Sequence, residues 1–377
     1  MSEAGDIAGG LPPPMSNPEL LGHEEAETRV LDAWYAGRMP HAWLIAGPRG
    51  IGKATLAYRI AKFVLSGGKT TGEAGLFGAD DAPPTSLATD PTHRVARLVA
   101  SEGHRDLHIL RRQLNDRGVL SQVVRVDDVR AFEAGMRLHS AEGGWRVAIV
   151  DEAERMNRNA ENALLKILEE PPPNTLILIV SNAESAMLAT TRSRCRRLPL
   201  SPLPDTVVST LLARARPDLT HADTMVILRL ADGSIGSAIA LADAGGAKLY
   251  RMVVAVLGTL PEIDGEALHA MAGAWARKPK EGELDPFATG TALMRRWIDQ
   301  SIRAASAAPG LTEITPGDLE AGRAWVARIG VEAAFRRRAA VERLIRLEQV
   351  VNLERKQVIL DSVHTLAYGE DIGRGGV

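Results

Sequence analysis

The feature that most constrains the fold is the segment Gly47-Pro48-Arg49-Gly50-Ile51-Gly52-Lys53. It follows the short apolar run 42–46 and precedes a helical pattern over residues 53–65. The spacing G-x-x-x-x-G-K is typical of a phosphate-binding loop, in which glycines let successive N–H groups face one anion and the lysine adds a point charge. A helix N-terminus behind the loop adds its dipole. We therefore predict a strand–loop–helix unit that binds phosphate, with a plain glycine-rich turn as the alternative.

The residue after the lysine departs from this motif. A Ser or Thr there would bind Mg²⁺ through its hydroxyl, whereas this chain has Ala54. Thr55 lies about 100° further around the helix and does not take over that position. The motif therefore keeps its phosphate contacts and lacks one metal contact. The candidate nucleotide-binding residues are Gly47, Gly50, Gly52, Lys53 and Thr55.

Two acids, Asp151 and Glu152, end the apolar run 147–150. In a nucleotide-hydrolysing sheet, an acid at the end of a strand holds Mg²⁺, and a following Glu polarises the attacking water. Taken alone, the pair also fits solvated acids at a strand end. Downstream of a phosphate-binding loop, it predicts that both acids belong to the same site.

Residues 192–197 contain four arginines. A guanidinium matches phosphate oxygens with its planar fork, and an arginine supplied by a neighbouring subunit stabilises transition-state charge. A solvated loop is the alternative. Cys195 is the single cysteine, so an internal disulfide and a Cys-rich zinc site are excluded. We expect no zinc, and we expect Cys195 to pack as a small apolar residue rather than act as a nucleophile.

The apolar runs alternate with helical patterns up to Pro202, which predicts an α/β fold with a mainly parallel sheet buried on both faces. Beyond that residue, only helical patterns remain. The predicted parts are a leader (1–20), the sheet-containing core (21–201), a small helical lid (202–247), an all-helical domain (248–368) and a tail (369–377).

Charge and hydropathy exclude several classes of protein. Lys and Arg number 45 against 47 Asp and Glu, so no overall basic field requires a nucleic-acid partner. No apolar run approaches the roughly 18 residues of a membrane helix, and the first residues lack the features of a secretory signal. Together with the single cysteine, this predicts a cytoplasmic protein without a membrane partner.

The motifs together resemble the bacterial clamp-loader ATPases of the AAA+ class. The resemblance covers about residues 20 to 365 and is densest between 145 and 200. Its most specific part is the helix sequence Asn162-Ala163-Leu164-Leu165-Lys166-Ile167-Leu168-Glu169-Glu170-Pro171-Pro172, followed by Arg192-Ser193-Arg194-Cys195. Further segments carry it: Gly22-His23-Glu24, Pro40-His41-Ala42-Trp43-Leu44 and Asp151-Glu152-Ala153-Glu154.

The resemblance implies an AAA+ phosphate-loop core, a small helical lid and a helical collar that joins subunits in a ring. It implies gamma/tau and delta subunits of DNA polymerase III as partners. A sliding clamp and primed DNA are contacted through that complex, which uses ATP to open the clamp. It also implies that Arg194 acts as an arginine finger on the nucleotide of a neighbouring ATPase subunit.

Departures from the family decide which kind of subunit to expect. Besides Ala54, the stretch Gly233-Ser234-Ile235-Gly236-Ser237 of the predicted lid has Gly236 where the ATPase subunits of the family carry an arginine. The four zinc-binding cysteines of many family members are also absent. We expect a stator-like subunit that lends Arg194 and turns over little ATP, with Asp151 and Glu152 vestigial. Binding of ATP and Mg²⁺ stays open. The alternatives are an ATP-hydrolysing gamma/tau-type subunit and a nucleotide-gated adaptor outside replication.

Overall fold

The computed structural model describes residues 10–68, 84, 86–114, 120–137, 144–279, 283–351 and 353–369. The chain divides into two compact units. The first unit comprises Met1–Leu211 and Gly233–Gly236, and the second comprises Leu212–Asp232 and Ser237–Val377. Each unit has its own architecture, and the division runs through two helices.

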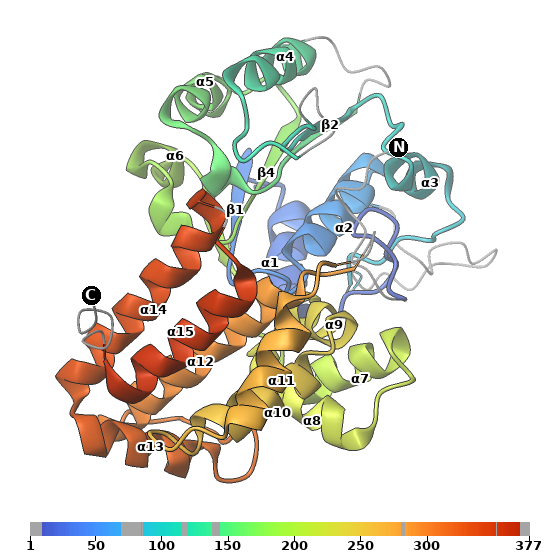
Figure 1. Cartoon of the computed structure of the whole chain (residues 1–377). Coiled ribbons are helices and arrows are strands. Elements are labelled where there is room, and N and C mark those ends of the chain that lie inside the picture. The colour runs from blue at the N-terminus through green and yellow to red at the C-terminus, as the bar shows by residue number, and fades with distance from the viewer. Residues whose placement is uncertain are drawn as a thin grey trace. The chain divides into compact units, whose positions relative to one another are not determined.

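The first unit combines strands and helices (Figure 1). Its strands are β1 (Ala42–Ala46), β2 (Leu107–Leu110), β3 (Arg146–Val150), β4 (Thr175–Ser181) and β5 (Arg196–Pro199). Its α-helices are α1 (Glu24–Tyr35), α2 (Lys53–Leu65), α3 (Arg94–Ala100), α4 (Val126–Arg137), α5 (Arg158–Glu169) and α6 (Ala189–Ser193). Two short 3-10 helices are η1 (Ala153–Arg155) and η2 (Glu184–Ala186).

The described part of the second unit is helical. Two helices span the division between the units, α7 (Asp205–Ala215) and α9 (Ile235–Asp243). The remaining helices are α8 (His221–Ala231), α10 (Gly246–Leu257), α11 (Gly265–Ala276), α12 (Pro286–Ala305), α13 (Asp318–Ile329), α14 (Val331–Val351) and α15 (Arg355–Tyr368).

The sheet has the strand order β2-β3-β4-β1-β5, and every neighbouring pair is parallel. Strands β1, β3 and β4 are buried along their whole length, which explains their continuous apolar sequences. In the centre of the sheet, Leu44 of β1 lies opposite Ile179 of β4 and Arg197 of β5. The structure confirms the predicted α/β class, with a parallel sheet in the first unit and helices in the described part of the second.

Alternate side chains of the strands enter two different hydrophobic cores. Trp43 and Ile45 pack into the core that contains side chains of α1, α2 and α3. Leu44 and Ala46 pack into the core that contains side chains of α4 and α5. The alternation follows from the two-residue period of a strand. Helices therefore cover both faces, and the carboxyl ends of the parallel strands stay free for a site.

Most elements that the sequence patterns predict in the core are confirmed within a few residues, but these patterns predict neither β5 nor the short helices α3 and α6. In β5 only Leu198 is buried, and its flanking arginines are exposed, so the strand has no apolar run to detect. It forms because its backbone pairs with β1. The arginine-rich segment is therefore not one solvated loop, because its second half is an edge strand.

Some predictions fall on residues that lack a described placement. These are residues 1–9 of the leader, residues 69–83 and 85 of the segment 66–92, whose glycines and prolines predict a loop, and residues 370–377 of the tail. The helical pattern over residues 331–360 predicts a break near Asn352, and α14 does end at Val351 before α15 begins at Arg355. Asn352 itself lies outside the described residues. The bounds of the five predicted parts remain predictions.

Large aromatic side chains form the centre of the second unit. Tyr250, Trp275 and Trp297 are fully buried there. A Cβ at Gly290 of α12 would lie 2.3 Å from the ring of Trp275, so only glycine allows α12 to approach α11 this closely. The tryptophans therefore act in packing, as their scattered positions in the sequence indicate.

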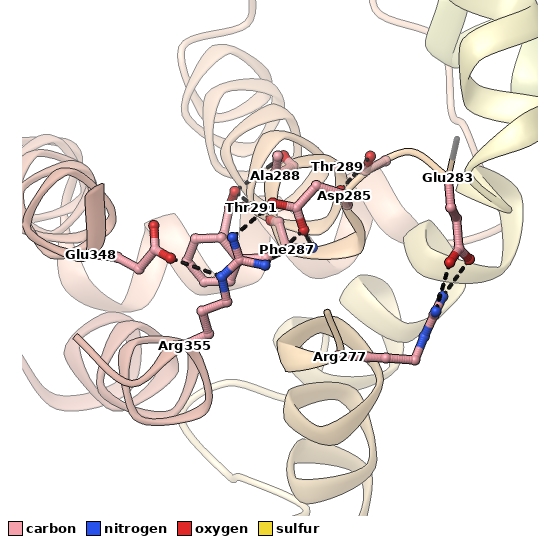
Figure 2. A network of polar contacts seen from close by, with 9 residues as sticks. All are labelled: Arg277, Glu283, Asp285, Phe287, Ala288, Thr289, Thr291, Glu348 and Arg355. Atoms are coloured by element: carbon pink, nitrogen blue, oxygen red, sulfur yellow. Dashed lines mark hydrogen bonds and ion pairs between the residues drawn. The ribbon is translucent and has the colours of Figure 1, made fainter. Parts of the chain in front are cut away.

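A polar network joins three helix ends of this unit around Arg355, as Figure 2 shows. The guanidinium donates to both carboxylate oxygens of Asp285 at 2.9 Å and to Glu348 Oε1 at 2.8 Å. It also lies 5.0 Å from the centre of the Phe287 ring. Asp285 in addition caps α12 by accepting from the Phe287 N–H. One side chain thus connects the start of α12, the end of α14 and the start of α15.

We expect Arg355→Lys to lower the free energy of unfolding by about 1–3 kcal/mol, because an ammonium cannot bond both carboxylates in the same geometry or stack equally on Phe287. Urea denaturation of the full chain measures the change. The control is Arg277→Lys, whose partner Glu283 lies in an exposed pair of the same region (Figure 2). An equal loss in both variants would contradict the structural role of Arg355.

Candidate functional site

The phosphate loop, residues 47–53, connects β1 to α2 and is shaped by its glycines. Gly50 and Gly52 have φ values of 75° and 105°, which glycine adopts readily. A Cβ at position 47 would lie 2.4 Å from the carbonyl oxygen of Leu200. The N–H of Gly47 donates to the carbonyl of Ser181 at 3.3 Å, which ties the loop to the end of β4. The predicted loop conformation therefore needs glycine at these positions.

Lys53 is the first residue of α2 and is only 4% exposed. Its ammonium donates a hydrogen bond to the carbonyl oxygen of Pro48, within the same loop. Burial lowers the pKa of Lys53 to about 8, although the nearby acids Glu154 and Asp151 act in the opposite direction. The ammonium is therefore bonded to the loop and feels the charges of the acids that follow β3.

Ala54 and Thr55 follow in the first turn of α2, and both are half-buried. The Ala54 methyl group supplies no ligand for Mg²⁺. The roles of Thr55 and of the loop residues in nucleotide binding stay predictions. The loop glycines and Lys53 are the residues that would hold a phosphate group, whereas Ala54 lacks the hydroxyl that would bind a phosphate-bound Mg²⁺.

Asp151 and Glu152 lie at the carboxyl end of β3. Burial raises the pKa of Asp151, and the neighbouring charge of Glu152 raises it further. Glu152 has a φ of 49° and its carboxylate forms an ion pair with Arg112. Arg112 also donates to the carbonyl of Ser121 at 3.1 Å. The acid expected to polarise water is thus held by an arginine of its own chain.

Sequence reasoning missed a polar group at the end of β4. The Asn182 side-chain amide donates to Glu154 Oε1 at 2.7 Å, and its backbone N–H donates to Oε2 at 3.1 Å. Burial disfavours the charged form of Glu154, but these hydrogen bonds and one from Ser181 lower its pKa overall. A signal was present, because polar residues directly after a buried parallel strand line the site edge of such a sheet.

The lid stretch, Gly233–Gly236, belongs to the same unit as the phosphate loop. The N–H of Gly236 donates to the carbonyl of Gly50 at 2.9 Å, and the Ser234 hydroxyl donates to the carbonyl of Arg49 at 2.8 Å. A Cβ at position 236 would lie 2.9 Å from Gly50 Cα. A side chain at 236 therefore requires the two backbones to move apart.

Arg194 follows the short helix α6 and contacts different elements. Its Nη1 donates to the carbonyl of Thr190 at 2.9 Å, and its Nη2 lies 2.7 Å from Glu169 Oε1. Glu169 lies on α5 and Thr190 lies on α6. These contacts therefore do not join Arg194 to the phosphate loop or to Asp151 and Glu152. The other arginines differ, because Arg197 pairs with Glu184 and Arg196 lies over the Trp43 ring at 5.1 Å.

Cys195 is partly buried, and its thiol donates to the carbonyl of Thr191 at 3.3 Å. Burial raises its pKa to about 12. Because the thiolate is the nucleophilic form, this thiol is poorly suited to covalent chemistry. Its environment agrees with the packing role that the sequence indicates.

The described residues contain neither a candidate membrane span nor a candidate metal cluster. No helix among them combines the length and the apolar content needed to cross a membrane. Within the same residues, no group of three or more His, Cys, Asp or Glu side chains is arranged to hold a metal ion.

Comparison with known proteins gives matches on this same region. Residues 22–204 match the family described as DNA polymerase III, delta subunit. The DNA polymerase III subunit delta' of Pseudomonas aeruginosa is 36% identical over 196 residues, covering 52% of this chain and 53% of the relative. That of Escherichia coli is 30% identical over 217 residues, covering 56% and 58%.

A gamma/tau subunit from Mycobacterium tuberculosis is 29% identical over 342 residues, covering 84% of this chain and 55% of the relative. The chain thus spans about half the length of the curated relatives it matches. A solved DNA polymerase III gamma subunit-related protein from Thermotoga maritima is 14% identical, with a TM-score of 0.39 and coverage of 92% and 98%.

The family match covers the sheet, the phosphate loop and Arg194, and the relatives found include both delta' and gamma/tau subunits. Residues 22–204 are therefore similar to the clamp-loader subunits of DNA polymerase III, among them relatives that carry the name delta'.

Proposed function

We propose that this chain is the stator-like delta' subunit of a DNA polymerase III clamp loader and acts in the cytoplasm. It helps to load the sliding clamp onto primed DNA, with gamma/tau and delta subunits as its direct partners. It lends Arg194 to the nucleotide of a neighbouring ATPase subunit and hydrolyses little or no ATP itself.

The observation that carries this proposal is a contrast between two charged groups. The side chain of Arg194 is 36% exposed at the end of α6, where another chain can reach its guanidinium. Glu152, in the chain's own site, is instead paired with Arg112. An arginine finger typically contributes 10³–10⁵ in rate. An accessible guanidinium on a chain whose own site is restrained therefore suits a subunit that activates its neighbour.

Two further features of the site support weak turnover. Ala54 supplies no hydroxyl to Mg²⁺, and Gly236 contacts the loop backbone where the ATPase subunits of the family carry an arginine. The loop glycines and Lys53 still fit the phosphates of ATP. We therefore propose that ATP binds without efficient hydrolysis, and titration calorimetry with ATP and Mg²⁺ tests this binding directly.

The second candidate is an ATP-hydrolysing subunit of the gamma/tau type. It is favoured by the presence of both Asp151 and Glu152 and by the long match to a gamma/tau relative. The two candidates differ in the ATP turnover of the isolated chain. Turnover close to that of a complete loader would favour the second.

We expect the isolated chain to show negligible ATP turnover. We expect Arg194→Ala to lower the DNA-stimulated ATPase of a reconstituted loader at least tenfold, because the developing phosphate charge loses its guanidinium. A steady-state ATPase assay of the complex measures both. The control is Arg196→Ala, which removes a nearby arginine that lies over Trp43.

Assembly must be checked by gel filtration for each variant, so that a lost subunit is not mistaken for lost chemistry. Normal ATPase in a fully assembled Arg194→Ala loader would show that Arg194 is only a surface charge. An equal loss in Arg196→Ala would show that the whole arginine segment, rather than one guanidinium, is responsible.

We expect Gly236→Arg to leave ATP turnover low and to destabilise the protein by about 1–3 kcal/mol, because overpacking forces the lid stretch away from Gly50. Chemical denaturation and an ATPase assay of the isolated chain measure the two effects. The control is Gly273→Arg, where a Cβ meets no atom within 4 Å. Gain of turnover without loss of stability in Gly236→Arg would mean that the lid glycine alone limits hydrolysis.

A further inference from the structure

Arg194 is anchored at two points that come from two different helices. The carbonyl of Thr190 belongs to α6, which ends one residue before Arg194. The carboxylate of Glu169 belongs to the last residue of α5 and lies 2.7 Å from Nη2. The guanidinium therefore has a defined direction within the isolated chain.

The position of Glu169 follows from the local sequence. Glu169 is the last residue of α5, and Glu170 follows it as the C-cap. Three prolines at 171–173 prevent the helix from continuing, so the Glu169 side chain lies at a helix end. A cation beside the last carbonyls of α6 is also favoured by the helix dipole, although α6 is short. Both anchors thus depend on backbone elements of the core rather than on a flexible loop.

The anchored guanidinium still has donors to offer. A guanidinium carries five N–H donors, and the two contacts leave further donors for an outside acceptor. The side chains of Arg194 and Glu169 are 36% and 49% exposed, so a phosphate from another chain can approach. An exposed pair of this kind adds little to fold stability. Its effect is on the orientation of Arg194.

We propose that Glu169 is a positioning residue for Arg194, an inference that rests on the proposed function. By holding Nη2 while the Thr190 carbonyl holds Nη1, Glu169 directs the remaining donors of the guanidinium toward the neighbour's phosphate. A side chain that is ordered before binding loses less conformational freedom in the transition state than a freely rotating one. Glu169 therefore raises the rate in the neighbouring subunit without touching the nucleotide.

The adjacent acid supplies a matched control. Glu170 has the same charge and is also exposed, but the ion pair of Arg194 is formed with Glu169. Replacing either acid with glutamine removes one negative charge from the same surface. Only the change at Glu169 alters the anchoring of Arg194.

The test uses the full chain reconstituted with gamma/tau and delta subunits, the clamp and primed DNA. We expect Glu169→Gln to lower kcat for ATP roughly 3- to 30-fold while the KM for ATP changes less than about twofold, since orientation acts in the transition state. Glu169→Asp should recover part of the rate. Glu170→Gln should match the wild type, and thermal melting should be the same for all variants.

A double-mutant cycle separates this inference from the proposed function. If Glu169 acts through Arg194, Glu169→Gln causes no further loss in an Arg194→Ala background. A loader unaffected by Arg194→Ala would overturn both the arginine finger and the role of Glu169. Suppose instead that Arg194→Ala impairs the loader. The role of Glu169 alone would then be overturned if Glu169→Gln leaves the rate unchanged, raises it, or lowers it further in the Arg194→Ala background.

Discussion

The close approach of two backbones at the phosphate loop is the constraint on which the candidate site depends. Gly50 carries no side chain and meets the lid stretch directly through the hydrogen bond from Gly236. Gly47 likewise passes next to the Leu200 carbonyl after β5. These contacts determine the path of the loop and so the position at which α2 begins. Lys53 then enters the site with its ammonium buried.

Charged side chains of the first unit are distributed among separate pairs. Glu152 is bound by Arg112, Glu184 by Arg197, and Glu169 by Arg194. The first of these pairs restrains an acid of the chain's own site, whereas the last holds an arginine that remains accessible. This division of charge supports a subunit whose contribution to chemistry is made in the neighbouring site.

Much of the core could be predicted because its signals are local. The buried strands β1, β3 and β4 have continuous apolar sequences, and the loop motif lies between a strand and a helix as expected. Strand β5 could not be found in the same way, since three of its four residues are exposed. Its existence depends on hydrogen bonds to β1, and no periodicity within four residues reports such a partner.

The fold class, the phosphate loop and its missing hydroxyl could be predicted from the sequence alone, because each is set by residues that are neighbours along the chain. The partner of each charged group becomes known only from the folded arrangement. Arg112 and Glu152 are 40 residues apart, and Asn182 and Glu154 are 28 apart, yet each pair is in direct contact. The order of the parallel strands brings their carboxyl ends together, and no local pattern encodes that order.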